Sequence, residues 1–391
     1  MAGSSSSCSA IPPPATASVA LIAGATGMAG IALAEALKSP TALGSPWTVY
    51  AAARRPPTTR YPAVDGSLFF DALDPAATAA AISPISSCVT HLFWVALAAR
   101  ETAEDNIAAN SAMLSNVLAA LAVGDSGRRS LHVTLQTGTM HYMGPFIDPT
   151  RIGRLEVPFH EDYTPRSSVP VFYHAQEEIL ADAATRCRQL TWTVHRSSII
   201  LGASNRSAYN LLLTVCLYAL IARREGEPFA YPGTLYTWQH FCDASDAEVL
   251  AAQQIWAAAE AGRGALAAGE AFNCTNGDVF TWRSFWRAVA AEFGVEFVEC
   301  AEDGEGMGWA ERMRSKGPVW DEIVEENRLV RTRFEEITCF TAVCGVLSFR
   351  FQHVSSMNKS REMGFHVSVD TLKSVKKWIA RLREMNIIPK N

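Results

Sequence analysis

Short runs of consecutive apolar residues alternate with helical patterns through the first half of the chain. Helical periodicity covers 29–37, a stretch from Pro75 onward, and 102–122. The apolar runs between these patterns lie at 18–23, 47–53, 68–70, 91–95, 130–137 and 191–196. Strands of a parallel sheet are buried on both faces, so they read as continuous apolar runs. The pattern predicts the α/β class, as a Rossmann-type doubly wound parallel sheet covered by helices.

The second half of the chain has a different pattern, in which helices dominate. Helices are predicted at 210–224, 244–261, 281–293, 319–327 and 371–383, with strands only at 271–274 and 296–298. We therefore expect a dinucleotide-binding Rossmann domain over 18–202. A smaller, mostly helical substrate-binding lobe is expected over 203–391, partly interleaved with that domain. Residues 1–17 are rich in Ser, Pro and Ala and carry no charge, which predicts a disordered leader.

Composition narrows the class of protein. The 391 residues are 49% hydrophobic and 19% charged with a net charge of -5, so a nucleic-acid-binding surface is not expected. No apolar run reaches the roughly 18 residues of a membrane span. The nine cysteines form no CxxC pair, which favours free thiols in a reducing compartment and no metal site. Because the first basic residue is Lys38, a transit peptide is disfavoured and a cytoplasmic protein is expected.

A glycine-rich turn joins the first predicted strand to the first predicted helix. Gly24, Gly27 and Gly30 have the GxxGxxG spacing of a dinucleotide fingerprint. Glycines allow a tight turn, and backbone N–H groups at the start of the helix can then approach a pyrophosphate. In the first unit of an alternating strand–helix series this motif predicts a dinucleotide site, and a turn without ligand is the alternative.

The end of the second predicted strand favours the 2′-phosphorylated cofactor. An NAD site usually offers an acidic residue there, whereas this chain has Arg54 and Arg55. A guanidinium group matches a phosphate in charge and geometry, so we predict NADP(H), with two solvated surface arginines as the alternative. Asp71, after the third strand, is placed either to meet the adenine or to cap a helix.

A tyrosine is the candidate catalytic residue. Tyr173 lies ahead of a predicted helix, as does the tyrosine of short-chain dehydrogenases, which acts with a lysine four residues later. Here that position is Glu177, and the seven lysines of the chain leave none between Lys38 and Lys316. A tyrosine–lysine pair therefore cannot be assembled from this part of the chain.

A series of further motifs runs through the chain in order. They are VALIAGATG at 19–27, ARRP at 53–56, DALDP at 71–75, THLFW at 90–94, LQTGTMHYMGP at 135–145, FY at 172–173, TWTVHR at 191–196, FNCTNGD at 272–278, PVW at 318–320 and SMNKS at 356–360. Through this series the sequence, from 18 to 389, resembles the progesterone 5β-reductase and iridoid synthase family of plants. That family is an atypical branch of the extended short-chain dehydrogenases/reductases.

The resemblance implies an enzyme that reduces the C=C bond of an α,β-unsaturated carbonyl compound with NADPH. Hydride goes to the β-carbon, and Tyr173 would stabilise the enolate oxygen. The family lysine of the TGxKHYMGP motif corresponds to Met140. A tyrosine hydroxyl, whose ordinary pKa is about 10, can donate a hydrogen bond at neutral pH without a lysine. Because losing one oxyanion donor costs about 10²–10³-fold in rate, we expect activity that is lowered or narrowed rather than abolished.

The resemblance also implies the cofactor contacts, from the pyrophosphate turn through the 2′-phosphate and adenine ends to the nicotinamide. They are Gly24, Thr26, Gly27, Met28, Ala29, Arg54, Arg55, Asp71, Ala72, Ala96, Gln136, Tyr173, Ile200, Ser207, Ala208 and Tyr209. Two departures from the family lie near the nicotinamide. One is Ala96, where threonine is common, and the other is 197–199, where Pro-Gly is usual.

The expected ligand besides the cofactor is a small apolar enone, steroid-like or monoterpenoid, as in the family. The stretch 211–222 with Tyr218 is a candidate pocket wall, with simple core as the alternative, and Phe146 and Phe172 are further candidates. Segment 334–353 fits the family poorly and is unusually apolar for a surface. It is interpreted as an apolar wall, a partner contact or a poorly folded stretch. Dimers are common for this fold, which makes a homodimer the assembly to test.

Met140 keeps a second function class open. The alternative hypothesis is a protein that binds NADP(H) with little or no turnover and acts as a sensor or partner-binding module. It predicts tight NADPH binding and equal behaviour of the wild type and Tyr173→Phe. An ordinary carbonyl reductase or epimerase is disfavoured, because reversible alcohol oxidation needs a base and the usual lysine is missing.

Overall fold

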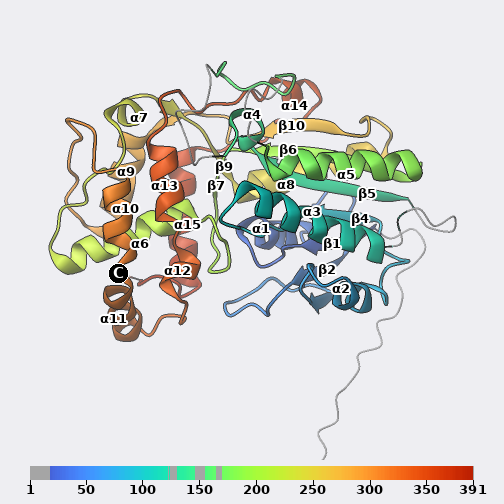
Figure 1. Cartoon of the computed structure of the whole chain (residues 1–391), viewed down its shortest axis with the longest axis horizontal. Coiled ribbons are helices and arrows are strands. Elements are labelled where there is room, and N and C mark those ends of the chain that lie inside the picture. Colours follow the sequence, from blue (N-terminus) through green and yellow to red (C-terminus); the bar gives the residue numbers. More distant parts are fainter. Residues whose placement is uncertain (1–17, 122, 124–129, 146–154, 164–169, 391) are drawn as a thin grey trace, which may run out of the picture.

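The computed structural model describes residues 18–121, 123, 130–145, 155–163 and 170–390. The predicted leader 1–17 and the candidate wall residue Phe146 therefore lie outside the described residues. Figure 1 shows a sheet flanked by helices on one side of the molecule and a mostly helical lobe on the other.

Seven parallel strands form the main sheet, in the order β10-β6-β5-β4-β1-β2-β3. They are β1 (Ser18–Ala23), β2 (Trp47–Ala53), β3 (Gly66–Phe69), β4 (His91–Trp94), β5 (Leu131–Gly138), β6 (Leu190–Ser197) and β10 (Glu270–Cys274). The predicted Rossmann-type sheet is confirmed, with its strand ends within about two residues of those expected. The strand predicted at 296–298 is wrong, because Phe297 makes only an isolated bridge with Phe229.

Both faces of the sheet are apolar and covered. In β1, Val19 and Leu21 belong to one buried cluster, whereas Ala20 and Ile22 belong to another, so the side chains alternate between two cores. Helices cover the first face as α2 (Pro75–Ile82), α3 (Ala103–Ala120) and α5 (Phe172–Arg186), and the second as α1 (Met28–Leu37) and α8 (Ala247–Gly262). This double cover explains why the strands are apolar throughout.

The second half of the chain contributes to both parts of the molecule, since α8 and β10 belong to the sheet layers. The lobe is built from α6 (Leu211–Glu225), α7 (Leu235–Gln239), α9 (Trp282–Phe293), α10 (Met307–Arg314), α11 (Gly317–Asn327), α12 (Phe334–Ile337), α13 (Phe340–Leu347) and α15 (Thr371–Glu384). Shorter elements complete the fold: α4 (Met140–Met143), α14 (Asn358–Glu362), and the pairs β7 (Ile199–Leu201) with β9 (Ala244–Asp246) and β8 (Phe241–Cys242) with β11 (Phe280–Thr281).

Helix α6 lies at the centre of the lobe. The side chain of Asn210 caps its start by accepting a hydrogen bond from the Leu213 N–H at 3.0 Å. All of its residues from Leu211 to Ala222 are buried. Tyr218 packs against Phe229 and Trp309, and its hydroxyl donates to the Ala230 carbonyl oxygen at 3.0 Å. Tyr218 is therefore a core residue of the lobe.

The divergent segment 334–353 is folded. It forms α12 and α13, and Phe340, Val343 and Leu347 of α13 are buried against α6 and α10. Burial of these side chains explains the apolar composition of the segment. The interpretation as a poorly folded stretch is therefore wrong.

Some features are not found in the part of the chain that the structure describes. No helix there has the length and apolar character needed to cross a bilayer. No group of three or more His, Cys, Asp or Glu side chains in these residues is arranged to hold a metal ion. The described cysteines, Cys339 and Cys344 included, form no disulfide with one another.

Candidate active site

The turn between β1 and α1 admits only glycine at two of its three glycine positions. Gly24 has a φ of 91°, and a Cβ there would lie 2.8 Å from the Ala96 backbone. A Cβ on Gly30 would clash with the carbonyl oxygen of Gly24. At Gly27, by contrast, such a Cβ would meet no described atom closer than 3.4 Å. The N-terminus of α1 at this turn fits a pyrophosphate, which helix N-termini bind through their backbone N–H groups.

Segment 204–209 lies against this turn. Ser204 Oγ donates to the Thr26 carbonyl oxygen at 2.8 Å, and the Met28 N–H donates to Ser207 Oγ at 3.0 Å. Ala208 and Tyr209 follow and are exposed. The tertiary structure thus brings Thr26 and Met28 next to predicted contacts that lie about half the chain away. The Ala29 side chain is buried, so only its backbone is available to a ligand.

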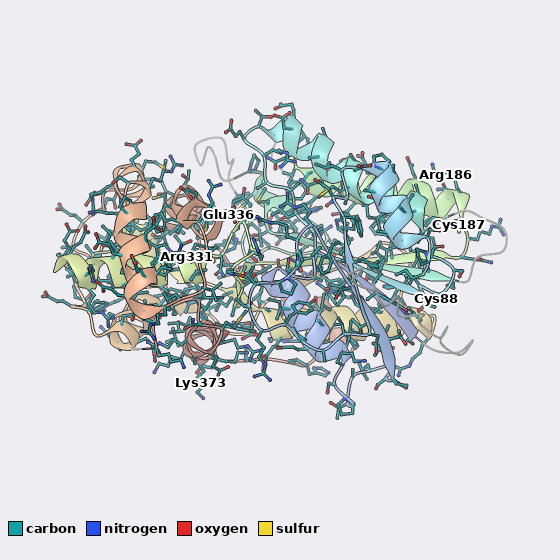
Figure 2. The ribbon with its side chains drawn as sticks, turned by 90° about the horizontal axis from the view of Figure 1, so that it is seen from below. Cys88, Arg186, Cys187, Arg331, Glu336 and Lys373 are labelled. Atoms are coloured by element: carbon teal, nitrogen blue, oxygen red, sulfur yellow. The ribbon has the colours of Figure 1, made fainter. Side chains whose placement is uncertain are left out.

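Arg54 and Arg55 directly follow β2 and are both exposed. Arg55 Nη2 lies 3.5 Å from Oε2 of Glu336 on α12, and Nη1 of Arg206 lies 3.8 Å from the same oxygen. Figure 2 shows Glu336 on the side of the lobe that faces the sheet. Sequence reasoning missed both Arg206 and Glu336. Arg206 directly precedes Ser207, which was a usable signal, but no local pattern links Glu336 to β2.

Asp71 and Ala72 follow β3. Asp71 Oδ1 accepts a hydrogen bond from the Leu73 N–H at 3.0 Å, within its own turn. The cap of α2 is Asp74, whose Oδ1 accepts from the N–H groups of the two residues after Pro75. The helix-cap interpretation of Asp71 is therefore wrong, and its exposed carboxylate is available to a ligand.

The carboxyl ends of β4 and β5 carry the remaining predicted contacts. Ala96 follows β4 and faces Gly24, and Gln136 Oε1 accepts from Gln254 Nε2 at 3.3 Å. Ile200 lies on β7 and is partly buried against the apolar cluster that includes α1 and against a smaller one that includes residues of α8. The Tyr173 hydroxyl oxygen lies 3.3 Å from where a Cβ on Gly138 would be. The candidate catalytic hydroxyl thus lies over the end of β5.

Tyr173 is held in an apolar setting at the start of α5. The ring of Phe172 packs against it with 4.4 Å between centroids. Burial, with a smaller contribution from Tyr209, raises the pKa of Tyr173 well above its usual value. The hydroxyl is therefore protonated at neutral pH and is a hydrogen-bond donor rather than a base.

Met140 begins α4, two residues after the end of β5, and is partly buried against the core. The next residue, His141, is buried, and its Nδ1 lies 3.4 Å from Glu177 Oε1. Burial lowers the pKa of His141. Glu177 Oε2 in turn lies 3.7 Å from Arg196 Nη2. Position 177, where short-chain dehydrogenases carry the lysine four residues after the tyrosine, therefore holds a carboxylate that is paired with His141 and Arg196.

A buried polar chain begins at Thr139, between Gly138 and Met140. Thr139 Oγ1 and His353 Nε2 are 2.8 Å apart, and His353 Nδ1 lies 3.8 Å from Asp243 Oδ1. Asp243 also accepts from Ser198 Oγ at 2.5 Å and from the Ser355 N–H at 2.6 Å. Burial lowers the pKa of His353 to about 4 and raises that of Asp243 to about 7. The chain ties the end of β5 to segment 353–355, and sequence reasoning did not find it.

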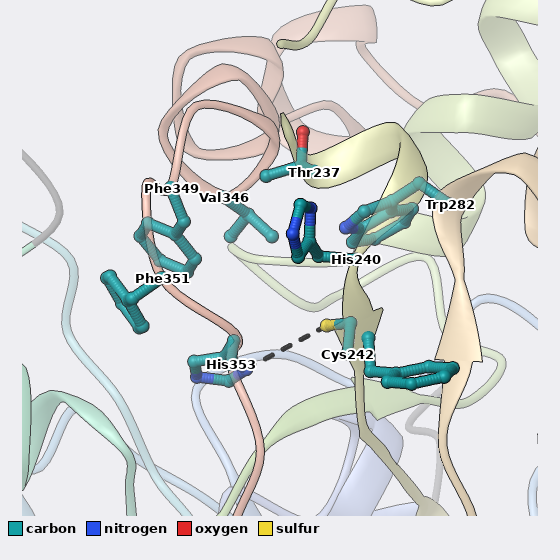
Figure 3. A pocket seen from close by; sticks show the side chains of 9 residues that line it. Thr237, His240, Cys242, Trp282, Val346, Phe349, Phe351 and His353 are labelled. Carbon is teal, nitrogen blue, oxygen red and sulfur yellow. Dashed lines mark hydrogen bonds between the residues drawn. The ribbon is translucent and has the colours of Figure 1, made fainter. Parts of the chain in front are cut away.

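A small cavity lies beside His353 (Figure 3). Its volume is about 10 Å³, and its lining residues are Thr237, His240, Phe241, Cys242, Trp282, Val346, Phe349, Phe351 and His353. A single water needs roughly 10–15 Å³, whereas a pocket for a small molecule has roughly 300–1,000 Å³. The cavity is of the size of one water and is not the substrate site.

The glycine turn, the parallel sheet and the half-buried tyrosine at the strand ends define a Rossmann-fold protein of the short-chain dehydrogenase/reductase type. The sequence matches the PRISE-like Rossmann-fold domain over residues 20–389, and the chain belongs to that family. It is 39% identical to the 3-oxo-Delta(4,5)-steroid 5-beta-reductase of Arabidopsis thaliana over 373 residues, which cover 95% of this chain and 93% of the relative. It is 40% identical to an (S)-8-oxocitronellyl enol synthase of Camptotheca acuminata, with the same coverage. The resemblance found in the sequence is confirmed.

Solved structures with the same fold are more distant in sequence. A UDP-glucose 4-epimerase aligns with a TM-score of 0.65 at 13% identity, over 95% of this chain and 100% of its own. A putative epimerase from Burkholderia cenocepacia aligns with a TM-score of 0.57 at 19% identity, over 94% and 98%. These likenesses support the fold, including the packing of the lobe against the sheet.

Proposed function

We propose that this protein reduces the C=C bond of small apolar α,β-unsaturated carbonyl compounds with NADPH. The observation that carries the proposal is the protonated Tyr173 hydroxyl over the end of β5, in a family whose relatives are named as a steroid 5-beta-reductase and enol synthases. The steroid and monoterpenoid names suggest substrates with little polar surface. The absence of disulfides among the described cysteines favours a reducing compartment, and we propose the cytoplasm.

The residues present fit a dinucleotide cofactor. The pyrophosphate would lie at the backbone of Gly27, Met28 and Ala29. The turn that holds these residues is shaped by Gly24, Thr26 and Ser207. Arg54 and Arg55 would bind the 2′-phosphate, and Asp71 with Ala72 the adenine. Ala96, Gln136, Ile200, Ala208 and Tyr209 would surround the nicotinamide. When bound, the reduced nicotinamide supplies the hydride.

Tyr173 would act on the carbonyl end of the substrate. As a C–H bond forms at the β-carbon, the electron pair of the C=C bond moves toward the carbonyl and leaves negative charge on its oxygen. The Tyr173 hydroxyl donates a hydrogen bond to that oxygen and stabilises the enolate. A proton from solvent or from Tyr173 then reaches the α-carbon or the oxygen. Burial keeps Tyr173 protonated until this step, which suits a donor.

Met140 makes this site weaker than one with lysine. Its side chain carries no charge, so the enolate oxygen loses one donor, which costs about 10²–10³-fold in rate. Glu177 cannot replace the lysine because it is a carboxylate already paired with His141 and Arg196. These two observations favour a second candidate function, a protein that binds NADP(H) with little turnover and acts as a sensor or partner-binding module.

We further propose that the two parts of the chain have different functions. Residues 18–202 would bind the cofactor, and residues 203–391 would shape the substrate site. The division is interleaved, because α8 and β10 of the second part lie in the sheet layers. The contact of segment 204–209 with the glycine turn makes the junction itself part of the cofactor site.

NADPH consumption with 2-cyclohexen-1-one separates the two candidate functions. The wild type, Tyr173→Phe and Met140→Lys are compared at equal NADPH occupancy. An active wild type with an inactive Tyr173→Phe supports the reductase, and the gain in Met140→Lys then measures the missing donor. Turnover only in Met140→Lys supports the cofactor-binding alternative. Equal, substantial rates in the wild type and Tyr173→Phe contradict the assigned role of Tyr173.

A further inference from the structure

We propose that Arg206 is a third phosphate-binding residue of the cofactor site, and that the Glu336 carboxylate occupies the position between Arg55 and Arg206 that the 2′-phosphate takes. The inference rests on the proposed function, because it assigns this guanidinium pair to the 2′-phosphate of NADP(H). It makes α12 of the lobe part of cofactor selection.

Two guanidinium groups share one carboxylate at this place. The Arg55 and Arg206 contacts with Glu336 Oε2 measure 3.5 and 3.8 Å, longer than the roughly 2.7–2.9 Å of a charge-assisted hydrogen bond. Arg206 Nε is buried and has no hydrogen-bond partner among the described residues. A phosphate has three free oxygens and close to two negative charges, so it can accept from both forks where one carboxylate oxygen does not.

The burial of Arg206 distinguishes it from a surface arginine. Its side chain is 16% exposed, against 54% for Arg55. Burial first and the neighbouring Arg55 second lower the pKa of Arg206. Both effects disfavour the charged guanidinium, and the single Glu336 carboxylate does not fully offset them. With Arg54 close by in sequence, one carboxylate faces a local excess of positive charge, which a dianionic group would neutralise.

The backbone around Arg206 connects the three parts of this site. Ser207, the next residue, holds the Met28 N–H at the start of α1. Asn205, the preceding residue, donates through Nδ2 to Thr58 Oγ1 at 2.9 Å and to Thr332 Oγ1 at 3.2 Å. Segment 204–209 therefore links the pyrophosphate turn, the loop after β2 and the residues that lead into α12. A phosphate entering between Arg55 and Arg206 must displace the Glu336 carboxylate.

The test compares dissociation constants for NADPH and NADH, measured by cofactor fluorescence without substrate. Arg206→Leu is expected to weaken NADPH binding by about tenfold or more and to leave NADH binding unchanged, because only NADPH carries the 2′-phosphate. Glu336→Gln is expected to tighten NADPH binding about threefold or more, because the competing charge is removed. The matched controls are Arg333→Leu and Glu335→Gln, an exposed ion pair of 3.5 Å at the start of α12, which should leave the NADPH/NADH ratio unchanged.

Three results would overturn the inference. One is an equal loss of NADPH and NADH binding in Arg206→Leu, since Arg206 would then only support the loop. Another is weaker or unchanged NADPH binding in Glu336→Gln. The third is an equal effect of the control pair. Arg206→Lys, which keeps the charge but not the fork, should fall between the wild type and Arg206→Leu, and it replaces Arg206→Leu if that variant unfolds. A wild type that binds NADH as tightly as NADPH overturns the proposed cofactor preference as well. A preference for NADPH that persists in Arg206→Leu overturns the role of Arg206 but leaves the proposed cofactor preference intact.

Discussion

Two turns lie at the carboxyl edge of the sheet, one after β1 and one after β5, and they differ in what determines their structure. The turn after β1 is shaped by backbone: Gly24 and Gly30 are required by close contacts, and a Cβ on Gly27 would make only ordinary contacts. The turn after β5 is shaped by side chains: Thr139 bonds His353, and His141 pairs with Glu177. Both present chemistry at the same edge, as parallel strands require.

The difference explains why one turn kept its pattern and the other changed. Backbone N–H groups are supplied by any residue, so a backbone site depends only on the glycines that allow the geometry. A side-chain site depends on each residue, and at Met140 one substitution removes a charge from the family motif. Near Met140, Glu177 lies within ion-pair distance of His141 and Arg196, although Glu177 Oε1 and His141 Nδ1 are buried without a hydrogen-bond partner among the described residues.

The strongest way to break the first turn is Gly30→Ala. A Cβ there meets the Gly24 carbonyl oxygen and the Ala25 backbone, which cannot move aside, so we expect the unfolding free energy to fall by at least about 4 kcal/mol. Thermal unfolding measures this. The control Gly308→Ala lies in α10 with no described atom within 4 Å, and it should stabilise by about 0.5–1 kcal/mol. A Gly30→Ala protein as stable as the wild type would contradict the close contact.

The β5 side of the sheet should be the more sensitive to acid. Burial lowers the pKa of His91 to about 4, of His132 to about 3 and of His195 to about 4. These imidazoles are neutral in the folded state but take up protons below pH about 6.5 in the unfolded state, so stability falls as the pH falls from about 6.5 toward 4. Asp243, with its pKa raised to about 7, acts in the opposite direction between about 4 and 7.

Because these three imidazoles and His353, whose pKa is also lowered to about 4, oppose one carboxyl, we expect a net loss on the order of 5 kcal/mol between pH 7 and 5. Denaturant unfolding at the two pH values measures it. His132→Gln removes the most strongly shifted imidazole, whose ring nitrogens contact Thr191 and Thr193, and should flatten the pH dependence. A stability that rises between pH 7 and 5 would contradict the buried neutral state of these histidines.

The polar chain behind the β5 turn can be tested at Asp243. Asp243→Ala leaves the Ser355 N–H without its buried acceptor and leaves the Ser198 hydroxyl only the backbone carbonyl oxygen of residue 243, so we expect a loss of about 2–3 kcal/mol in unfolding free energy. Asp243→Asn keeps an acceptor of the same shape and resembles the protonated acid, so its cost should be about 1 kcal/mol or less. Equal costs for the two variants, measured by denaturant unfolding, would show that the hydrogen bonds do not matter.

The smallest expected effect comes from Gly138→Ala. The new Cβ would lie 3.3 Å from the Tyr173 hydroxyl and 3.1 Å from the Ser197 carbonyl oxygen, so the tyrosine must shift by a few tenths of an ångström. We expect turnover to fall about tenfold, because catalytic geometry is lost, while NADPH binding stays unchanged. Steady-state kinetics and a cofactor titration measure both quantities. Unchanged turnover would place the reacting atoms away from this hydroxyl.

Particular elements show which features of the fold could be predicted from the sequence. The six strands of the first half were found because each is a continuous apolar run between helical patterns. The strand expected at 296–298 failed because three residues carry no periodicity that distinguishes a strand from a bridge. The cap at Asp74 was missed in favour of Asp71, since two acids three residues apart give the same local signal.

Sequence alone determined the α/β class, the glycine turn, the two arginines after β2 and the family, because each depends on neighbours in the chain or on a motif of fixed order. Only the tertiary structure decided that Arg206 and Glu336 lie beside Arg55. It also decided that Glu177 pairs with His141 and Arg196, and that Thr139 is connected to Asp243 through His353. These partners come from segments far apart in the sequence. Their pairing is set by how the lobe packs on the sheet, since burial makes a charge or polar group find a partner that no local pattern can name.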